Sequence, residues 1–457
     1  MVIFAYALWA HRFAPQRLPQ FGLNPPFPVD QYYNLLAEGF TDGHLYIRKE
    51  VPAQLRQLKD PYDSHANYAI RVGTGISNKG SIHDLSYYNG RLYLYFSALP
   101  ALLIFLPYSL LTSDYLDQAT GCALFCTIGF IAQSAVLIRF KKAFWNSITE
   151  KQFSFFVFTL GILNFSPLLL RRAAVWEIPV ACGFAFGSLS IYFAAKLYLT
   201  QKNAARDTVL LGTCVAFAIV CRPTLIFFAL LCLVPLWYAF RFRPSKFITT
   251  LLCLIAPAFP IGAAAMWYNY ARFGNVMDFG IQYQLSGDPR KLILFSPHYV
   301  IFGLKAYLFT FRGWVPTFPF LTFLAPSVYP AGYLGIEQTV GLLTCLPALP
   351  LGLFFLGRIR RSETFPGFFT LLIGIAVLSL LTVAAFVGAT LRYEMEFAPV
   401  FALLSTFGMV KVCSVETARR SSVQTAVVFI ALAVSILFIF LEMNCPLNLY
   451  LNPQMYS

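Results

Sequence analysis

Charged residues are scarce in this sequence, and acidic residues are the scarcer kind. Asp and Glu together number 20 among 457 residues, and charged residues make up 12% of the chain. Soluble domains carry about 25%. The hydrophobic fraction is 58% and the mean hydropathy is +0.65. This composition excludes an ordinary soluble protein. Apolar runs of about 18–24 residues recur along the chain, so we expect one polytopic bundle of membrane helices.

Several sequence motifs of enzymes are also missing. The chain has no P-loop, no GxGxxG, no HExxH and no GxSxG motif. Their absence argues against nucleotide-driven pumping and against the common protease and lipase mechanisms. Residues 12–95 contain no cysteine, so no disulfide can hold this segment. Cys122 and Cys126 lie one helical turn apart in an apolar run without His or carboxylate, which favours a packing role over a metal site.

The excess positive charge lies mainly in short connectors between apolar runs. The formal net charge is +14, which in a soluble protein would suggest nucleic acid as a partner. Here the positive-inside rule accounts for it, and no nucleic-acid partner is expected. The rule places these connectors on the cytoplasmic side. They are Arg139/Lys141/Lys142, Lys196/Lys202/Arg206, Arg241/Arg243/Lys246, Arg358/Arg360/Arg361 and Lys411/Arg419/Arg420.

Apolar runs and connectors together predict an all-α membrane protein with about eleven spans. The first run, 1–11, is only long enough for a short or truncated first helix, and the N-terminus is expected in the cytoplasm. If residues 96–112 crossed the membrane, every later basic connector would be placed on the outer side, against the positive-inside rule. This segment also contains Pro100 and Pro107, so we expect an interfacial helix there. The other predicted spans are 119–138, 152–170, 178–196, 207–221, 223–240, 247–270, 335–357, 366–388, 396–413 and 423–442.

This reading divides the chain into five parts. A long extracytoplasmic loop, 12–118, follows the first helix, and spans fill 119–270. A second long extracytoplasmic segment occupies 271–334, and C-terminal spans with an outer tail occupy 335–457. The first loop is the one long polar segment of the chain, and its acidic residues include Asp30, Asp42, Asp60, Asp63 and Asp84. We expect the functional site on this face.

Two acidic positions in the first loop are candidates for chemistry. Asp30, in Pro-Val-Asp-Gln-Tyr-Tyr, can accept a proton from an incoming hydroxyl or amine, or it can cap the helix predicted by YYNLLAEGF. Asp84 follows His83 just before a Gly turn and an aromatic run. The pair could relay a proton or bind a metal, or it could structure the turn, since adjacent residues on an extended segment point to opposite faces.

Arginines at the predicted outer ends of spans are the third feature, because positive-inside bias should deplete them there. Arginine grips phosphate through two parallel hydrogen bonds, and lipid phosphates sit at this depth. The alternative for each is a side chain that reaches toward the headgroups. These arginines are Arg171, Arg172, Arg222, Arg272 and Arg392.

Several segments, taken in their order along the chain, resemble those of the GT-C superfamily of integral membrane glycosyltransferases, in particular its bacterial members. The segments are a short first helix, an outer loop with an early Asp, HDLSYYNGRLYLYFSALPALLIFLPY (83–108), MWYNYARFGNVMDFGIQY (266–283) and LRYEMEFAPVFALL (391–404). Each segment is a loose match alone, but together and in order they cover most of the chain.

The resemblance implies transfer of a sugar from a polyprenyl-phosphate carrier to a glycan, lipid or protein acceptor on the non-cytoplasmic face of the bacterial inner membrane. Asp30 matches the acidic residue that activates the acceptor, and Asp84 matches a second acidic position. Arg392 matches a position suited to hold the lipid phosphate. Tyr393, His83 and the other outer arginines are further candidates for binding the lipid phosphate or the substrate. Gln31 stands where a second acid would complete a paired-acid metal site, so the metal is left open.

Two other classes of function are compatible with the composition. A transporter or flippase of a lipid-linked or small solute would need ionisable residues deep within the spans, and few are present. A non-catalytic membrane partner of a cell-envelope complex would need no cavity between Asp30, Asp84 and Arg392. If the enzyme reading is right, Asp30 and Arg392 should face one outward cavity near residues 96–112.

Overall fold

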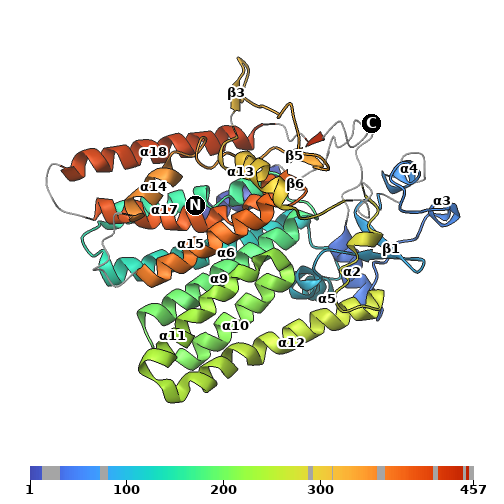
Figure 1. The fold of residues 1–457 in the computed structure, drawn as a ribbon, viewed down its shortest axis with the longest axis horizontal. Coiled ribbons are helices and arrows are strands. Elements are labelled where there is room, and N and C mark those ends of the chain that lie inside the picture. The colour runs from blue at the N-terminus through green and yellow to red at the C-terminus, as the bar shows by residue number, and fades with distance from the viewer. Residues whose placement is uncertain are drawn as a thin grey trace.

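The computed structural model describes residues 1–12, 31–72, 81–286, 292–310, 312–357, 366–414, 420–445 and 449–451. The fold is mostly helical, and the long helices run side by side along the longest axis of the molecule (Figure 1). Seven helices of the described part are long and apolar enough to cross a membrane, which is typical of an integral membrane protein. They are α6 (Gln118–Phe144), α9 (Glu177–Leu199), α10 (Ala204–Cys221), η2 with α11 (Pro223–Cys232, Leu233–Phe242), η3 with α12 (Pro244–Lys246, Phe247–Phe273), α15 (Pro366–Ala384) and α18 (Arg420–Met443).

The expected total of eleven spans is therefore wrong for the described residues. The run 152–170 is split into α7 (Glu150–Leu163) and α8 (Ser166–Leu170), because Phe165 takes a left-handed conformation with φ +66°. The run 335–357 begins as strand β5 (Gly335–Glu337) and holds only the ten-residue helix α14 (Ala348–Gly357). α17 (Ala398–Cys413) has 16 residues and α1 (Val2–Arg12) has 11, so both are shorter than a full span.

Among the described residues, the basic connectors that follow α6, α9 and α17 lie at one end of the bundle. Arg139 donates to the Tyr192 hydroxyl at 2.8 Å across α6 and α9. Lys196 pairs with Asp207 at 2.8 Å across the α9–α10 connector. The Ser147 hydroxyl donates to the Ser414 carbonyl, which joins the connectors that follow α6 and α17. We call this the basic end and the opposite one the outer end.

The first helix occupies only the half of the bundle nearest the outer end. His11 lies 3.6 Å from Asp117, just before α6 begins. The Tyr6 hydroxyl donates to the Asn164 side chain at 3.0 Å. Val2 packs beside Gly161 of α7, about 16 Å along that helix from Glu150 at the basic end. Val2 thus lies midway along the bundle (Figure 1), and the described chain does not place the N-terminus at the basic end.

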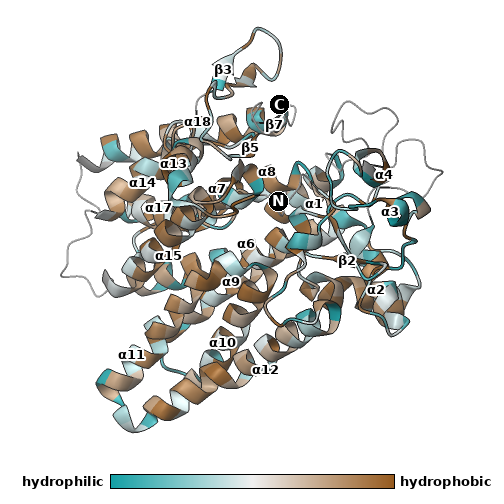
Figure 2. Cartoon of the chain, turned by 45° about the vertical axis from the view of Figure 1, so that its right-hand side comes forward, coloured by the Kyte–Doolittle hydropathy of each residue, from teal (hydrophilic) through white to brown (hydrophobic). Residues whose placement is uncertain are grey.

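The polar segment that follows forms a small unit at the outer end, where Figure 2 shows more hydrophilic residues than along the bundle. It contains α2 (Tyr32–Thr41), α3 (Ala53–Gln57), α4 (Tyr68–Val72) and the hairpin β1 (Leu85–Tyr88) with β2 (Arg91–Leu94). The hairpin turns through Asn89 and Gly90, both at positive φ, as a two-residue turn requires.

The segment expected to form an interfacial helix contains a short apolar helix, Ala101–Thr112, which is too short to span a membrane. It comprises a π-helical turn, η1 (Ala101–Phe105), and α5 (Leu106–Thr112), and it leaves Leu110 and Leu111 exposed. Pro107 lies just after the π-helical turn and has no amide hydrogen to donate to that turn. Stacking of Phe105 on Tyr33 holds this helix against α2.

A second group of small elements closes the outer end over the late helices. The short turn η4 (Ile281–Tyr283) packs on β1 of the polar unit. The turn η6 (Pro297–Tyr299) leads to α13 (Val300–Leu308) and the hairpin β3 (Arg312–Trp314) with β4 (Leu321–Phe323). A three-stranded sheet has the order β6-β5-β7, in which β5 is parallel to β6 (Gly388–Thr390) and antiparallel to β7 (Leu449–Leu451). The four-residue helix α16 (Leu391–Glu394) directly follows β6 and carries Arg392.

Candidate functional site

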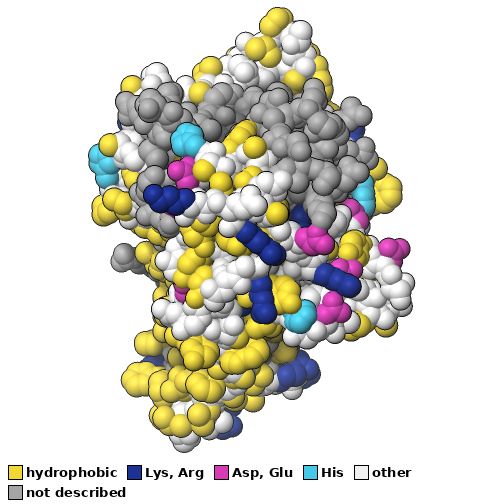
Figure 3. Space-filling model, turned by 90° about the vertical axis from the view of Figure 1, so that its right-hand side faces the viewer, with side chains coloured by type: hydrophobic (Ala, Val, Ile, Leu, Met, Phe, Trp, Pro, Cys, Tyr) yellow, Lys and Arg dark blue, Asp and Glu magenta, His cyan; other side chains and the backbone are white. Residues whose placement is uncertain are grey.

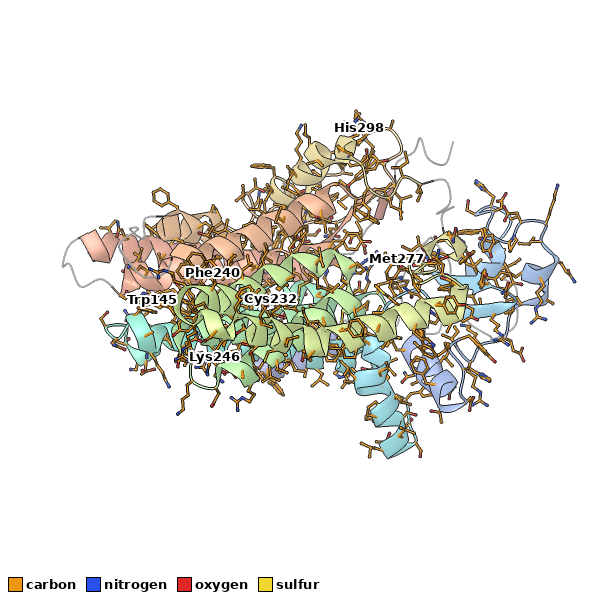
Figure 4. All side chains as sticks on the ribbon, turned by 60° about the horizontal axis from the view of Figure 1, so that its bottom comes forward. Trp145, Cys232, Phe240, Lys246, Met277 and His298 are labelled. Atoms are coloured by element: carbon orange, nitrogen blue, oxygen red, sulfur yellow. The ribbon has the colours of Figure 1, made fainter. Side chains whose placement is uncertain are left out.

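A cavity of about 1610 Å³ opens at the outer end, between the polar unit and the helix bundle. It exceeds the roughly 300–1,000 Å³ typical of small-molecule sites. Its wall includes Phe96–Leu99 and Leu102 of the interfacial segment, so it lies where the sequence places the site. Figure 4 shows Met277, which lines it, far from Trp145, Phe240 and Lys246 at the basic end.

One side of the cavity is a long apolar wall. Residues of α12 line it from Pro260 to Arg272, which corresponds to about 18 Å at the helical rise of 1.5 Å per residue. Phe217 and Val220 of α10 face the same space. A Cβ added at Gly262 would meet nothing within 4 Å, so the cavity is open beside this glycine. The cavity is therefore long and apolar along this side of the bundle.

The other end of the cavity is polar and contains Asp84. Both carboxylate oxygens accept hydrogen bonds: Oδ2 from the Trp176 indole at 2.7 Å and Oδ1 from the Gln284 amide at 2.8 Å. Asp84 has φ +63°, a conformation that Asp adopts more readily than most residues. Its amide donates to the Leu285 carbonyl at 3.0 Å, which fixes the carboxylate beside the start of β1.

His83 lies beside this carboxylate, with Nε2 at 3.7 Å from Asp84 Oδ2. Its Nδ1 is 3.5 Å from the Arg71 guanidinium. Burial lowers the pKa of His83 below its ordinary value; Asp84 opposes this shift and Arg71 adds to it. The imidazole is therefore held in its neutral form, with one nitrogen toward a cation and the other toward an anion.

This lowered pKa predicts a pH dependence of stability. The unfolded chain binds a proton at His83 near pH 6.5, whereas the folded protein binds it only at lower pH. The stabilising contribution is complete above about pH 6.5 and is lost as the pH falls through the folded pKa. Unfolding of the purified protein, measured from pH 7.5 to 5, should show a smaller acid-induced loss in His83→Gln. The exposed His298 lies elsewhere (Figure 4), and His298→Gln should keep the wild-type slope.

Arg392 faces the cavity from the end of β6 and belongs to a buried row of alternating charges. Its Nη1 donates to Glu337 Oε2 at 2.7 Å, and the other Glu337 oxygen accepts from Arg172. Arg172 in turn donates to Glu177 Oε1 at 2.7 Å and 3.0 Å. Burial opposes the charge of Glu337, but the two arginines outweigh it and lower the pKa of that carboxyl. Burial also disfavours charge on Arg392, but Glu337, with smaller contributions from neighbours such as Tyr393 and Glu177, raises its pKa.

Two more cavity-lining arginines differ in their partners. Arg222 is held by Glu396 at 2.6 Å, and its guanidinium lies 5.0 Å from the centre of the Tyr393 ring. Arg272 donates to the carbonyl of Leu94 at 2.7 Å and to the Asn269 side chain at 2.8 Å, and both acceptors are uncharged. Arg272 therefore brings positive charge to the cavity that these partners do not neutralise.

The structure thus brings together six of the nine predicted site residues in one cavity wall: His83, Asp84, Arg222, Arg272, Arg392 and Tyr393. Arg171 and Arg172 do not line the cavity, and their guanidinium groups form ion pairs with buried glutamates. Arg171 pairs with Glu442 at 3.4 Å, so neither arginine is placed to bind a ligand in the cavity. Asp30 lies outside the described residues. Tyr32, two positions later, donates to the carbonyl of His83 at 2.8 Å.

Several residues of this site were not predicted from the sequence. Tyr95 lies among Asp84, Arg392 and Arg222, and burial, with Asp84, raises its pKa well above the ordinary value. Trp176 and Gln284 hold the Asp84 carboxylate, and Glu337 and Glu396 hold the arginines. The sequence does hold one signal for such a residue. Glu337 lies inside an apolar run, and an ionised group there needs a charged or hydrogen-bonding partner.

The described residues contain no group of three or more His, Cys, Asp or Glu side chains that could hold a metal ion. Asp30 is outside that set.

Comparison of the sequence with protein-family models and with curated proteins gives no match. The cavity and the residues that line it are therefore the features that indicate a function. Figure 3 shows basic, acidic and histidine side chains spread over this outer end, above a mainly hydrophobic lower part.

Proposed function

We propose that this protein is a membrane glycosyltransferase that takes a sugar from a polyprenyl-phosphate carrier and passes it to an acceptor at the outer end. The observation that carries the proposal is the shape of the cavity: about 18 Å of apolar wall along α12 leads to Arg272, and Arg222, Arg392 and Asp84 line the same cavity. A lipid-linked phosphosugar has the same order of parts, an apolar chain followed by an anionic phosphate and a polar sugar.

In the proposed reaction the acceptor hydroxyl oxygen attacks the anomeric carbon of the sugar. The bond from that carbon to the phosphate oxygen breaks, and the lipid phosphate leaves with the electron pair. Arginine hydrogen bonds stabilise the charge that develops on this phosphate. The acceptor proton passes to a carboxylate, and the resemblance to GT-C enzymes assigns this role to Asp30.

Asp84 has a supporting part in this scheme. Two of its lone pairs accept from Trp176 and Gln284, and a carboxylate has further acceptor sites for a sugar hydroxyl. It also faces a cavity lined by four arginines, so its negative charge offsets part of the positive charge there. The proposal needs no metal ion, and an external chelator separates a metal-dependent from a metal-independent reaction.

The cavity itself provides the decisive test. Gly262→Phe places a ring in the open space beside α12, so we expect binding of a polyprenyl monophosphate to weaken by at least about tenfold, or about 1.4 kcal/mol. Binding is read by native mass spectrometry of the protein in nanodiscs, and transfer by release of a radiolabelled sugar from its carrier. Gly367→Phe is the matched control, because Gly367 also faces open space but does not line the cavity.

Three outcomes would contradict the proposal. Unchanged lipid-phosphate binding in Gly262→Phe would remove the cavity as the carrier site. Binding without any sugar transfer, across the common polyprenyl-linked sugars and acceptors, would remove the enzyme function. Movement of the lipid-linked substrate across sealed vesicles without transfer would instead favour a flippase.

A further inference from the structure

A hairpin that projects from the outer end has an apolar, uncharged surface. It contains β3 and β4, and Figure 1 shows it rising sideways from the bundle beyond α18. We call residues 312–328 the outer hairpin. The sequence from 313 to 336 contains no Asp, Glu, Lys, Arg or His. Its large side chains are nevertheless exposed: Trp314 by 78%, Phe318 by 56%, Leu324 by 53% and Val328 by 75%.

Contacts with α18 fix the depth of this hairpin relative to the spans. Arg312 Nε donates to Glu442 Oε2 at 2.8 Å, and Glu442 is the last residue but one of α18. The Cys445 thiol lies 3.7 Å from the Leu321 carbonyl. The base of the outer hairpin is therefore pinned where a candidate membrane span ends, which is the depth of the lipid headgroups.

The surface beside it continues into the side of α18 that no other described element covers. Leu437 and Phe440, in the last two turns of α18, are each more than half exposed. In a span these side chains contact lipid. The apolar face of the outer hairpin extends this lipid-facing surface outward, and Figure 3 shows the projecting part at the top of the view with yellow and white side chains.

The tip of the outer hairpin also forms hydrogen bonds between its own backbone groups, which favours an environment poor in water. The amide of Val315 donates to the Phe320 carbonyl at 3.1 Å, and the amide of Phe320 donates to the Thr317 carbonyl at 2.7 Å. Pro316 and Pro319 have no amide hydrogen to satisfy. Unpaired backbone donors make entry into lipid costly, and these two hydrogen bonds reduce that cost for the turn.

We infer that the outer hairpin inserts its aromatic tip into the phospholipid interface beside α18. Aromatic side chains are favoured at this depth, whereas an apolar projection of this size is unfavourable in water. Because the segment carries no charge beyond Arg312, which Glu442 neutralises, the contact should not depend on anionic lipid. This inference is independent of the proposed enzyme activity.

Tryptophan quenching tests the contact directly. The protein is placed in phosphatidylcholine nanodiscs whose acyl chains carry bromine near the headgroup, and the emission of Trp314 is taken as the difference between wild type and Trp314→Phe. We expect this component to be quenched by the brominated lipid and protected from aqueous iodide. Trp145 is buried at the basic end, so the component lost in Trp145→Phe should show little quenching by either agent. Partial replacement with phosphatidylglycerol should change nothing.

Either of two results would overturn the inference. Quenching of Trp314 by iodide but not by brominated lipid would place the hairpin in water. Protection from both would mean that protein covers it, for example a second copy of this chain. If Trp314→Phe proves unstable, Phe318→Trp offers a second reporter, whose added emission must show the same lipid quenching.

Discussion

Glu442→Gln is expected to lower the free energy of unfolding by about 3–5 kcal/mol, because it leaves buried arginines without their anion. The Glu442 carboxylate is fully buried and accepts from Arg312 at 2.8 Å and 2.9 Å, while Arg171 lies 3.4 Å away. Gln338 adds a fourth hydrogen-bond donor at 3.0 Å. The neutral amide keeps the shape of the side chain but removes the charge that compensates two guanidinium groups.

The measurement is reversible unfolding in mixed micelles, followed as the denaturing detergent fraction rises. Glu150→Gln is the matched control, since it removes the same charge from a side chain that is 85% exposed and pairs with Lys141. Exposed ion pairs contribute about 0–1 kcal/mol, so this variant should unfold close to the wild type. Equal effects of the two substitutions would show that the Glu442 cluster is not a buried charge centre.

Asp30→Asn should reduce sugar transfer by about 10²–10⁴-fold, the usual contribution of a positioned general base. Binding of polyprenyl monophosphate should persist, because the arginines that line the cavity are unchanged. Asp84→Asn should have a smaller effect on the rate, because Asp84 is hydrogen-bonded by Trp176 and Gln284 and has a supporting part in the proposed reaction.

Initial rates under saturating donor and acceptor, with thermal unfolding measured in parallel, distinguish loss of chemistry from loss of folding. Asp114→Asn removes an acid from an exposed loop at the same end and should leave the rate unchanged. If Asp30→Asn retains full turnover and Asp84→Asn does not, the roles of base and support are reversed. Full turnover in both variants would show that neither Asp30 nor Asp84 takes part in the reaction.

Short basic connectors are a local signal in the sequence, and the described ones that follow α6, α9 and α17 lie at one end of the bundle. Hydropathy alone predicted the spans less well. It cannot register the left-handed Phe165 that interrupts 152–170, or the strand pairing that takes residues 335–337 out of a helix. Both depend on tertiary contacts that outweigh the preference of an apolar run for helix.

Of the five arginines at predicted outer span ends, Arg222, Arg272 and Arg392 line the cavity. Sequence could not show that Arg171 and Arg172 face inward instead, because their partners Glu442 and Glu337 lie far along the chain. For the same reason, the sequence does not show that Gln284 is a hydrogen-bond donor to Asp84. Residues that serve one cavity from distant segments leave no spacing pattern that a single sequence can reveal.

The parallel pairing of β5 with β6 also constrains the order of events during synthesis of the protein. Glu337 is aligned with Thr390, and Arg392 follows two residues later, so the ion pair that holds Arg392 needs this register. A shift of one residue would turn Glu337 to the opposite face of the sheet. When Glu337 leaves the ribosome its partner strand has not been made, and α15 must still enter the membrane between them. The cavity wall is thus completed only late in translation, after most of the bundle has been inserted.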